Sequence, residues 1–265
     1  MKHGTTLAAV LAAVLVAGCA TTHIEKPEFA PDGTNKVQRA ALVVNLTHVD
    51  PMKYSGWHGY CAGSEKDAKA VKDALDSFGV PYIALADSQA TRAGVEGAAR
   101  AVGEKIADGG LLMVYFSGHG GQQAAFSGEA ADGMDETICL YDGRLLDDTV
   151  WAWLKDVPRG VRVWLVTDCC NSGTNFRGAP HDYANGVRAW WRHNPDLLHW
   201  GASQDGQNAV GGPDGGFFTI ALRQAYEPGM TYEQWFKAAK KLVKGRQTPV
   251  ANHTGKDFQK TEAWK

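Results

Sequence analysis

The sequence has no large excess of charge of either sign. Its 27 Lys and Arg residues stand against 29 Asp and Glu residues, which leaves a net charge of -2. It also has no long basic run and no acidic tail. Proteins that bind nucleic acids or other polyanions usually carry clustered cations. The composition therefore predicts no nucleic-acid partner, and net charge alone indicates no other one.

The N-terminal apolar run is too short to cross a membrane as a mature helix. The segment Leu7–Ala17 follows a single lysine and is shorter than the ~20 residues that span a bilayer. It is typical of a secretory signal peptide. The run "LVAGC", which ends at Cys19, resembles the bacterial lipoprotein box, in which the cysteine is diacylated and becomes the new N-terminus. An ordinary signal peptide cut near Ala17 or Ala20 is the alternative.

The chain is expected to have three parts. Residues 1–18 are the predicted signal peptide, and 19–38 are a polar tether that contains two prolines and no periodicity. Residues 39–265 follow as one folded domain, because a chain of 265 residues with 44% hydrophobic content can bury a substantial core. This organisation predicts an exported protein in the bacterial cell envelope, held at the membrane by lipid on Cys19.

The folded part alternates short apolar runs with helical patterns. Apolar runs at 41–49, 81–87, 111–121 and 161–170 predict strands, and the continuous ones are typical of a parallel sheet. Residues 64–80 place apolar side chains on one helical stripe, and 91–109 predict a helix that is capped by Thr91 and closes near Gly109. The alternation continues to the C-terminus. It predicts an α/β fold with a sheet covered by helices.

Two of the predicted strands end in unusual chemistry, "VYFSGHGG" and "WLVTDCC". Ligands of such sheets bind beyond the carboxyl ends of the strands. Side chains alternate along a strand, so Asp168 and Cys170 share one side and Cys169 lies on the other. Ser117 and His119 share a side in the same way. Only Cys170 is therefore expected to face the crevice, with Cys169 as an apolar filler.

Cys170 and His119 together have the pattern of a nucleophile and its base. A cysteine nucleophile needs a neighbouring histidine to support its thiolate and to protonate the leaving amine. Taken singly, a buried cysteine or a histidine at a strand end is usually structural. Caspase-type peptidases, however, place the histidine about 50 residues before the cysteine. Here the interval is 170 − 119 = 51.

With these blocks in place, the chain resembles the metacaspase and orthocaspase branch of the caspase-like cysteine peptidases, peptidase family C14 of clan CD. "YFSGHGGQ" and "TDCCNSGT" are similar to the two catalytic blocks of that family, and "GSEKDAKAVKDAL" is similar to its first-helix segment. The resemblance runs from about Ala41 to the C-terminus. It implies a caspase-like fold, with a mostly parallel central sheet flanked by helices on both faces.

The resemblance also implies roles for particular residues. His119 and Cys170 would be the catalytic dyad, and the backbone amides of Gly120 and Cys170 would receive the oxyanion. Four residues would surround the pocket for the side chain before the scissile bond: Ser64, Asp67, Ser117 and Asp168. Two carboxylates converging in one pocket repel unless a cation joins them. Cleavage after Arg or Lys is therefore expected. Caspases that cut after aspartate bind it with arginines, and these blocks contain none.

The sequence departs from the family pattern at several positions. Asn171 stands where the family usually has histidine, and Ser64 where it often has cysteine. Many metacaspases are activated by calcium, and acidic residues occur here at matching places, namely Asp135, Asp147 and Asp148. Arg177 would oppose a cation near them. An acidic hairpin followed by helix-capping aspartates is the alternative reading of these residues, and the chemistry itself requires no cofactor.

Other functions of the same residues stay open. A caspase-like module that binds peptides without cutting them is the competing class, and an acyl transferase would use the same nucleophile. Protein or peptide substrates are the partners that the peptidase hypothesis predicts. Cys61 and Cys139 could pair in an exported protein, although sequence alone gives no distance between them. The histidines outside the catalytic block show no metal-ligand spacing.

Overall fold

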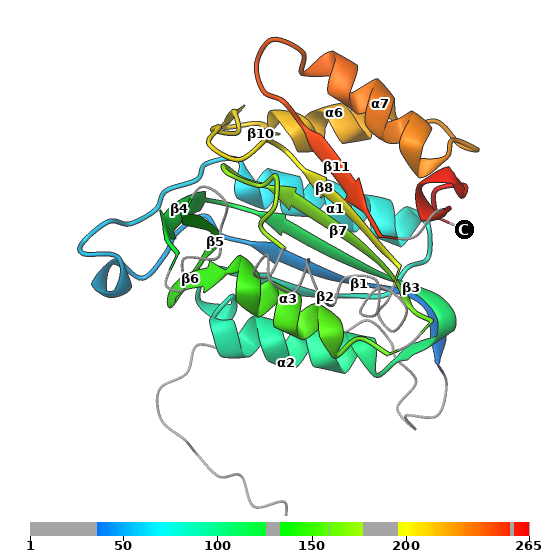
Figure 1. Cartoon of the computed structure of the whole chain (residues 1–265), viewed down its shortest axis with the longest axis horizontal. Helices are drawn as coiled ribbons and strands as arrows, with labels where there is room; N and C mark the ends of the chain where they lie inside the picture. Colours follow the sequence, from blue (N-terminus) through cyan, green and yellow to red (C-terminus); the bar gives the residue numbers. More distant parts are fainter. Residues whose placement is uncertain (1–35, 126–132, 159, 177–195, 255–256, 265) are drawn as a thin grey trace, which may run out of the picture.

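The computed structural model describes residues 36–125, 133–158, 160–176, 196–254 and 257–264. A six-stranded sheet in the order β11-β8-β7-β3-β1-β2 forms its centre (Figure 1). All neighbouring strands are parallel except β11, which is antiparallel to β8. The strands are β1 Val37–Asn45, β2 Tyr82–Ala86, β3 Ile106–Ser117, β7 Arg162–Asp168, β8 Leu197–Gly201 and β11 Val250–His253.

Helices cover both faces of this sheet (Figure 1). One face carries α1 Ser64–Ser77, α6 Phe217–Ala225 and α7 Tyr232–Leu242, and the other carries α2 Arg92–Gly103 and α3 Asp147–Lys155. Strand β1 supplies both cores by alternation, because Ala41 and Val43 lie in one buried cluster and Leu42 and Val44 in the other. A strand with both faces buried reads as a continuous apolar run, which is the pattern of β1, β3 and β7.

Short elements complete the described part of the chain. Near the carboxyl end of β3, three antiparallel strands form a small sheet: β4 Gly120–Ala124, β5 Met134–Leu140 and β6 Gly143–Leu146. A two-stranded glycine hairpin precedes α6, with β9 Gly211–Gly212 and β10 Gly215–Gly216. The 3-10 turns are η1 Pro51–Lys53, η2 Asp87–Gln89 and η3 Phe258–Lys260.

Aromatic side chains fill the core beneath α6 and α7. The ring of Trp164 lies 4.9 Å from that of Trp200, 5.0 Å from Tyr232 and 5.3 Å from Trp235, between ring centroids. Edge-to-face pairs of this kind add to the free energy gained by burying the rings. The tryptophans of β7 and β8 are therefore core residues rather than a binding surface.

The register of the central strands brings the unusual strand ends together. Asn45 of β1 pairs with Ser117 of β3, and Ser117 pairs with Asp168 of β7. The three strands thus end at one level, at the carboxyl edge of the sheet. The loops that follow them carry His119 and Cys170 to the same place.

The structure confirms the predicted α/β fold and corrects several element boundaries. The strands expected over 41–49 and 111–121 are Val37–Asn45 and Ile106–Ser117. The helix predicted over 91–109 ends at Gly103, because the chain from Ile106 onward is already part of β3. Ile106 is fully buried and pairs with Val37, and Gly109 follows at a φ of +75°, where the register between β1 and β3 shifts. The residues from Ile106 to Gly109 therefore belong to the strand and not to the predicted helix.

The N-terminal predictions lie outside the part of the chain that the structure describes. The signal peptide 1–18, Cys19 and most of the tether precede Lys36, and β1 begins at Val37, close to the expected start of the domain at Arg39. None of the helices in the described residues is long and apolar enough to cross a membrane.

Candidate active site

One pocket of about 310 Å³ lies at the carboxyl edge of the sheet and gathers the predicted site residues. Six of them line it together: Ser64, Asp67, Ser117, His119, Asp168 and Cys170. The opposite wall is the segment 209–213 with Gly215 and Gly216. Side chains from α1, β3, β7 and the two following loops therefore converge, as the strand-end argument requires.

The two adjacent cysteines face different surroundings. Cys169 is 2% exposed, packs in the core on the α2 and α3 face, and accepts a hydrogen bond from Asn175 Nδ2 at 3.6 Å. Burial raises its pKa well above the usual range. Cys170 is half-buried, and its thiol donates to the carbonyl oxygen of Ala209 at 4.0 Å. The pair thus divides as strand alternation predicted, with one thiol in the core and one in the pocket.

His119 is held by the loop that follows β1. Its Nε2 lies 3.4 Å from the carbonyl oxygen of Tyr60, and the Trp57 ring packs against its imidazole with centroids 4.8 Å apart. A carbonyl oxygen can only accept, so this contact requires the proton on Nε2 and leaves Nδ1 as the basic nitrogen. The Tyr60 carbonyl therefore orients the imidazole in the tautomer that a general base needs.

The surroundings of Cys170 and His119 favour the neutral form of each side chain. Burial raises the pKa of Cys170, and the nearby Asp168 carboxylate adds to that effect. Burial also lowers the pKa of His119. Both shifts oppose a thiolate–imidazolium pair, and the two side chains do not hydrogen-bond each other in this structure. Both shifts therefore favour a protonated thiol at Cys170 and a neutral imidazole at His119.

Asp67 projects from the first turn of α1 into the pocket floor. Its carboxylate accepts from the backbone N–H of Gly216, with both oxygens 2.9 Å from the nitrogen, and from Ser117 Oγ at 2.8 Å. The side chain is only 3% exposed. Burial and the neighbouring Asp168 raise its pKa to about 7, against the opposing effect of these hydrogen bonds.

Asp168 reaches the same floor from the end of β7. Its Oδ2 accepts from the backbone N–H of Thr219 at 2.9 Å and from Thr219 Oγ1 at 2.7 Å. The Thr219 hydroxyl also lies 2.6 Å from the Tyr115 hydroxyl. Burial raises the pKa of Asp168. No described residue forms an ion pair with Asp67 or Asp168, so the two carboxylates share a buried site without a cation.

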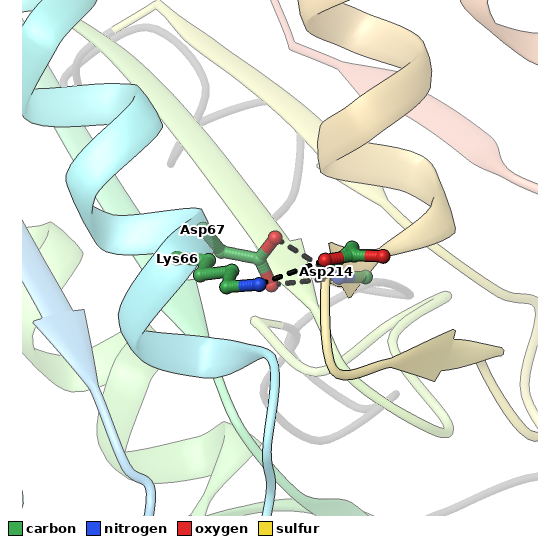
Figure 2. A network of polar contacts seen from close by, with 4 residues as sticks. Lys66, Asp67 and Asp214 are labelled. Carbon is green, nitrogen blue, oxygen red and sulfur yellow. Dashed lines mark hydrogen bonds and ion pairs between the residues drawn. The ribbon is translucent and has the colours of Figure 1, made fainter.

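The glycine hairpin of β9 and β10 closes this floor. A Cβ atom at Gly215 would overlap the carboxylate of Asp67, and one at Gly216 would overlap that of Asp168. Lys66 of α1 forms an ion pair with Asp214 of the hairpin turn at 2.7 Å, alongside the bond between Asp67 and Gly216 (Figure 2). The hairpin therefore lies directly against the acid pair, and only glycine fits there.

The remaining predicted pocket residues are engaged within the protein. The Ser64 hydroxyl is fully buried, lies 3.1 Å from Thr47 Oγ1 and donates to the Cys61 carbonyl at 3.2 Å. A Cβ at Gly120 would overlap the carbonyl oxygen of Cys170, so β4 approaches the nucleophile as closely as a backbone can. The proposed oxyanion role of the Gly120 and Cys170 amides stays a prediction.

Asn171 occupies a turn that suits its side chain. Its φ of +50° lies in the left-handed region, which asparagine adopts more readily than most residues. Its N–H donates to the Gln207 carbonyl at 3.0 Å, and its Oδ1 accepts from Gly206 N–H at 2.9 Å. The departure from the family's histidine therefore leaves the turn after the nucleophile well bonded.

The predicted calcium ligands lie apart from this pocket. Asp147 is 7% exposed, and its pKa rises to about 8 through burial and through the charges of Asp135, Asp148 and Glu136. Across the described residues, no group of three potential ligand side chains is arranged to hold a metal ion. Arg177 is outside the described part.

The cysteines of the described part are all free thiols. Cys61 and Cys139 are therefore unpaired in this structure.

Comparison with known proteins identifies the family to which this chain belongs. Residues 38–259 match the family model described as the caspase domain. The chain belongs to the caspase-domain family of cysteine-type peptidases. Metacaspase-1 of Mycosarcoma maydis is 30% identical over 151 residues, which cover 52% of this chain and 36% of that protein. The chain thus spans well under half the length of the metacaspases it matches.

Solved structures of the family share the fold. Protein GSU0716 from Geobacter sulfurreducens superposes with a TM-score of 0.71 at 28% identity, covering 86% of this chain and 98% of that one. Caspase-1 from Spodoptera frugiperda gives a TM-score of 0.56 at 13% identity, covering 82% and 87% of the two chains. The second likeness shows the fold alone. Together they confirm the predicted caspase-like architecture.

Several residues of this caspase-domain site were not found from sequence. Thr219 holds Asp168, the Gly216 N–H holds Asp67, and the Tyr60 carbonyl holds His119. Almost every residue has a backbone N–H and a carbonyl, so the residue type does not reveal which of these groups holds a side chain of the site. The run "GGPDGG" at 211–216 was the one usable signal, since four glycines around a turn indicate a backbone that approaches other atoms closely.

We predict that Asp67→Asn stabilises the protein at alkaline pH. Folded Asp67 keeps its proton up to about pH 7, whereas the unfolded residue loses it near the usual pKa, so this group makes wild-type stability fall as pH rises toward 7. The gain in unfolding free energy should be on the order of 2 kcal/mol at pH 8 and smaller at pH 5. Urea denaturation at both values measures it.

Asp73→Asn is the matched control, because Asp73 lies on the same helix but is exposed and paired with Lys69. It should change stability little at either pH. An Asp67→Asn protein that is less stable than wild type at pH 8 would show that the carboxylate pair does not repel.

Proposed function

We propose that this protein is a cysteine endopeptidase that cleaves peptide bonds after Arg or Lys. One observation carries the proposal: two buried carboxylates, which form no ion pair with a described residue, lie in the same pocket as a thiol and an imidazole. A guanidinium or ammonium group supplies the missing cation and can bond both carboxylates. The family membership supports the hydrolytic chemistry, and the acid pair supports the specificity.

The reaction follows from the positions of these groups. An arginyl side chain enters between Asp67 and Asp168, which places the carbonyl carbon of that arginine near Cys170. The thiol proton passes to Nδ1 of His119 as Sγ forms a bond to that carbon, and the oxyanion is received by the amides of Gly120 and Cys170. His119 then gives the proton to the leaving amine. A water molecule, deprotonated by His119, releases the acid and restores the thiol.

We predict that Cys170→Ala and His119→Ala each abolish peptidase activity while leaving the protein folded. Cys169→Ser should keep most activity, because the Cys169 thiol lies in the core and not in the pocket. Cleavage of a peptide with an internal arginine, together with circular dichroism of each variant, checks both parts. Full activity in the Cys170→Ala protein would exclude the mechanism.

The same variants separate the peptidase from its two competitors. A module that only binds peptides would show unchanged peptide affinity in all three variants and no cleavage in wild type. An acyl transferase would give an amide or ester product when an amine or alcohol acceptor is added, which mass spectrometry distinguishes from hydrolysis. The raised pKa of the Cys170 thiol also predicts that its alkylation by iodoacetamide accelerates as pH rises above 8.

We predict that Asp168→Asn lowers kcat/KM for arginyl substrates by roughly 30- to 1000-fold, because it removes a charge-assisted bond to the bound cation. In wild type, kcat/KM for these substrates should fall as pH drops through about 7, where free Asp67 takes up a proton. Without the Asp168 charge the pKa of Asp67 decreases, so the pH at which kcat/KM begins to fall should be lower in the Asp168→Asn protein. A pH series with both proteins measures the shift.

Asp73→Asn serves again as the control, with an unchanged profile expected. Equal cleavage after arginine and after a neutral residue in wild type would contradict the assignment of the pocket.

We further propose that calcium activates the enzyme through Asp135, Asp147 and Asp148. The support is electrostatic: burial is the main cause of the raised pKa of Asp147, and the charges of Asp135, Asp148 and Glu136 add to it, so a divalent cation would relieve that part. The described side chains are not arranged as a metal site, so binding would require them to move together. Millimolar calcium should raise activity severalfold in wild type but not in Asp147→Asn. Equal activity in chelator and in excess calcium would favour the acidic-hairpin alternative.

We also propose that the protein is anchored at the bacterial cell envelope by lipid on Cys19. The support is the "LVAGC" run after a short apolar segment. Cys19→Ser should move the protein from the membrane fraction to the soluble fraction, and intact-mass measurement should find the lipid only in wild type. A mature chain that lacks Cys19 would point to the ordinary signal peptide.

A further inference from the structure

Exposed apolar side chains concentrate on the loop between β1 and α1. Within the described residues, four large hydrophobic side chains are strongly exposed, and three of them belong to this loop: Met52 at 87%, Trp57 at 45% and Tyr60 at 66%. The fourth, Leu242 at 55%, lies on α7. Scattered exposed apolar residues need no explanation, whereas a local group of them marks an interaction surface.

The loop that carries these side chains is held in place by hydrogen bonds. Val49 N–H donates to the His58 carbonyl at 3.0 Å, and the Tyr54 hydroxyl donates to the Leu140 carbonyl of β5 at 2.7 Å. Gly59 adopts a φ of +58°, and a Cβ atom there would lie 2.8 Å from Val49 Cγ2. The aromatic rings are thus presented in a defined position, which reduces the entropy lost when a ligand binds.

The rings of Trp57 and Tyr60 border the catalytic histidine. Trp57 packs against the His119 ring, Tyr60 lines the pocket of Cys170, and the Tyr60 ring lies 5.2 Å from that of His48. Figure 1 shows the loop projecting from the same end of the sheet as β4, next to the carboxyl ends of the strands. The exposed surface is therefore continuous with the active site.

The direction of the reaction decides which part of a substrate meets this surface. The side chain before the scissile bond enters between Asp67 and Asp168, so the acyl part of the substrate extends from that side of Cys170. The leaving amine takes its proton from His119 and departs past its ring. The residue that follows the scissile bond therefore meets Trp57 and Tyr60 first.

We propose that Trp57 and Tyr60 form a subsite for an apolar or aromatic side chain immediately after the scissile bond. The inference rests on the proposed peptidase function and adds a second specificity element to it. Contact with such a side chain removes the exposed ring faces from water, whereas an aspartate there would lose hydration and meet the negative faces of the rings. The preferred cleavage site is then a basic residue followed by an apolar one.

The test compares peptides that are identical except for the residue after a single arginine, which is Phe, Gly, Asp or Lys. Dissociation constants are measured with the Cys170→Ala protein, so that binding is observed whether or not peptides are cut. Values of kcat/KM are measured with wild type. Both are repeated in Trp57→Ala and Tyr60→Ala backgrounds and with Leu242→Ala, which removes an exposed apolar side chain far from the pocket.

We expect the Phe peptide to exceed the Gly peptide about 10-fold in affinity and in kcat/KM, the discrimination that one apolar contact supplies. This ratio should fall below about 3 in the Trp57 and Tyr60 variants and stay unchanged with Leu242→Ala. Taking the ratio cancels any effect of Trp57 on His119 itself. Equal binding of Phe and Gly peptides, a preference for Lys, or a ratio that survives both substitutions would overturn the subsite.

The experiment can reject the proposed peptidase function and the proposed subsite independently of each other. Peptides that bind with the Phe preference but are never cut would reject the peptidase function and retain the surface. Cleavage after arginine with no dependence on the next residue would retain the peptidase and reject the subsite.

Discussion

The repulsion between two buried carboxylates is the constraint on which the rest of the site depends. Asp67 and Asp168 come from different elements, α1 and β7, yet share one buried floor in which they accept hydrogen bonds from protein donors and form no ion pair with any residue that the structure describes. Holding them together requires donors from Ser117, Gly216 and Thr219, and it requires a hairpin wall without side chains. The folded protein keeps this unfavourable arrangement, and the basic side chain of the proposed substrate would make it favourable.

Much of this site could be predicted because it lies on regular strands. Alternation along β7 separates Cys169 from Cys170, and the aligned ends of parallel strands bring Ser117 and Asp168 to one level. The groups that complete the site could not be predicted, since the Tyr60 carbonyl and the Gly216 amide are backbone atoms placed by loops. The predicted end of the 91–109 helix is wrong for a related reason. Ile106 is compatible with a helix and with a strand, and its pairing with Val37 makes it part of the strand.

The same logic explains why the acidic group around Asp147 is harder to interpret than the pocket. Asp67 and Asp168 are each fixed by named donors on a shared wall. Asp147 accepts a hydrogen bond from the backbone N–H of Asp148 at 2.9 Å, and the side chains of Asp135 and Asp148 affect it through their charges. Charge proximity without converging oxygen atoms is compatible with a cation site and with a solvated acidic hairpin. Geometry separates these cases, and charge alone does not.

The raised pKa of the Cys170 thiol has a consequence for the oxidation of its sulfur. Peroxides and other electrophiles attack thiolates rather than thiols, so a nucleophile that keeps its proton between turnovers is chemically protected. Burial and the Asp168 charge both hold the proton on Cys170. Under the proposed specificity, a bound cationic side chain would neutralise that charge and make the thiol easier to ionise. The reactivity of the sulfur would then depend on the presence of a basic substrate.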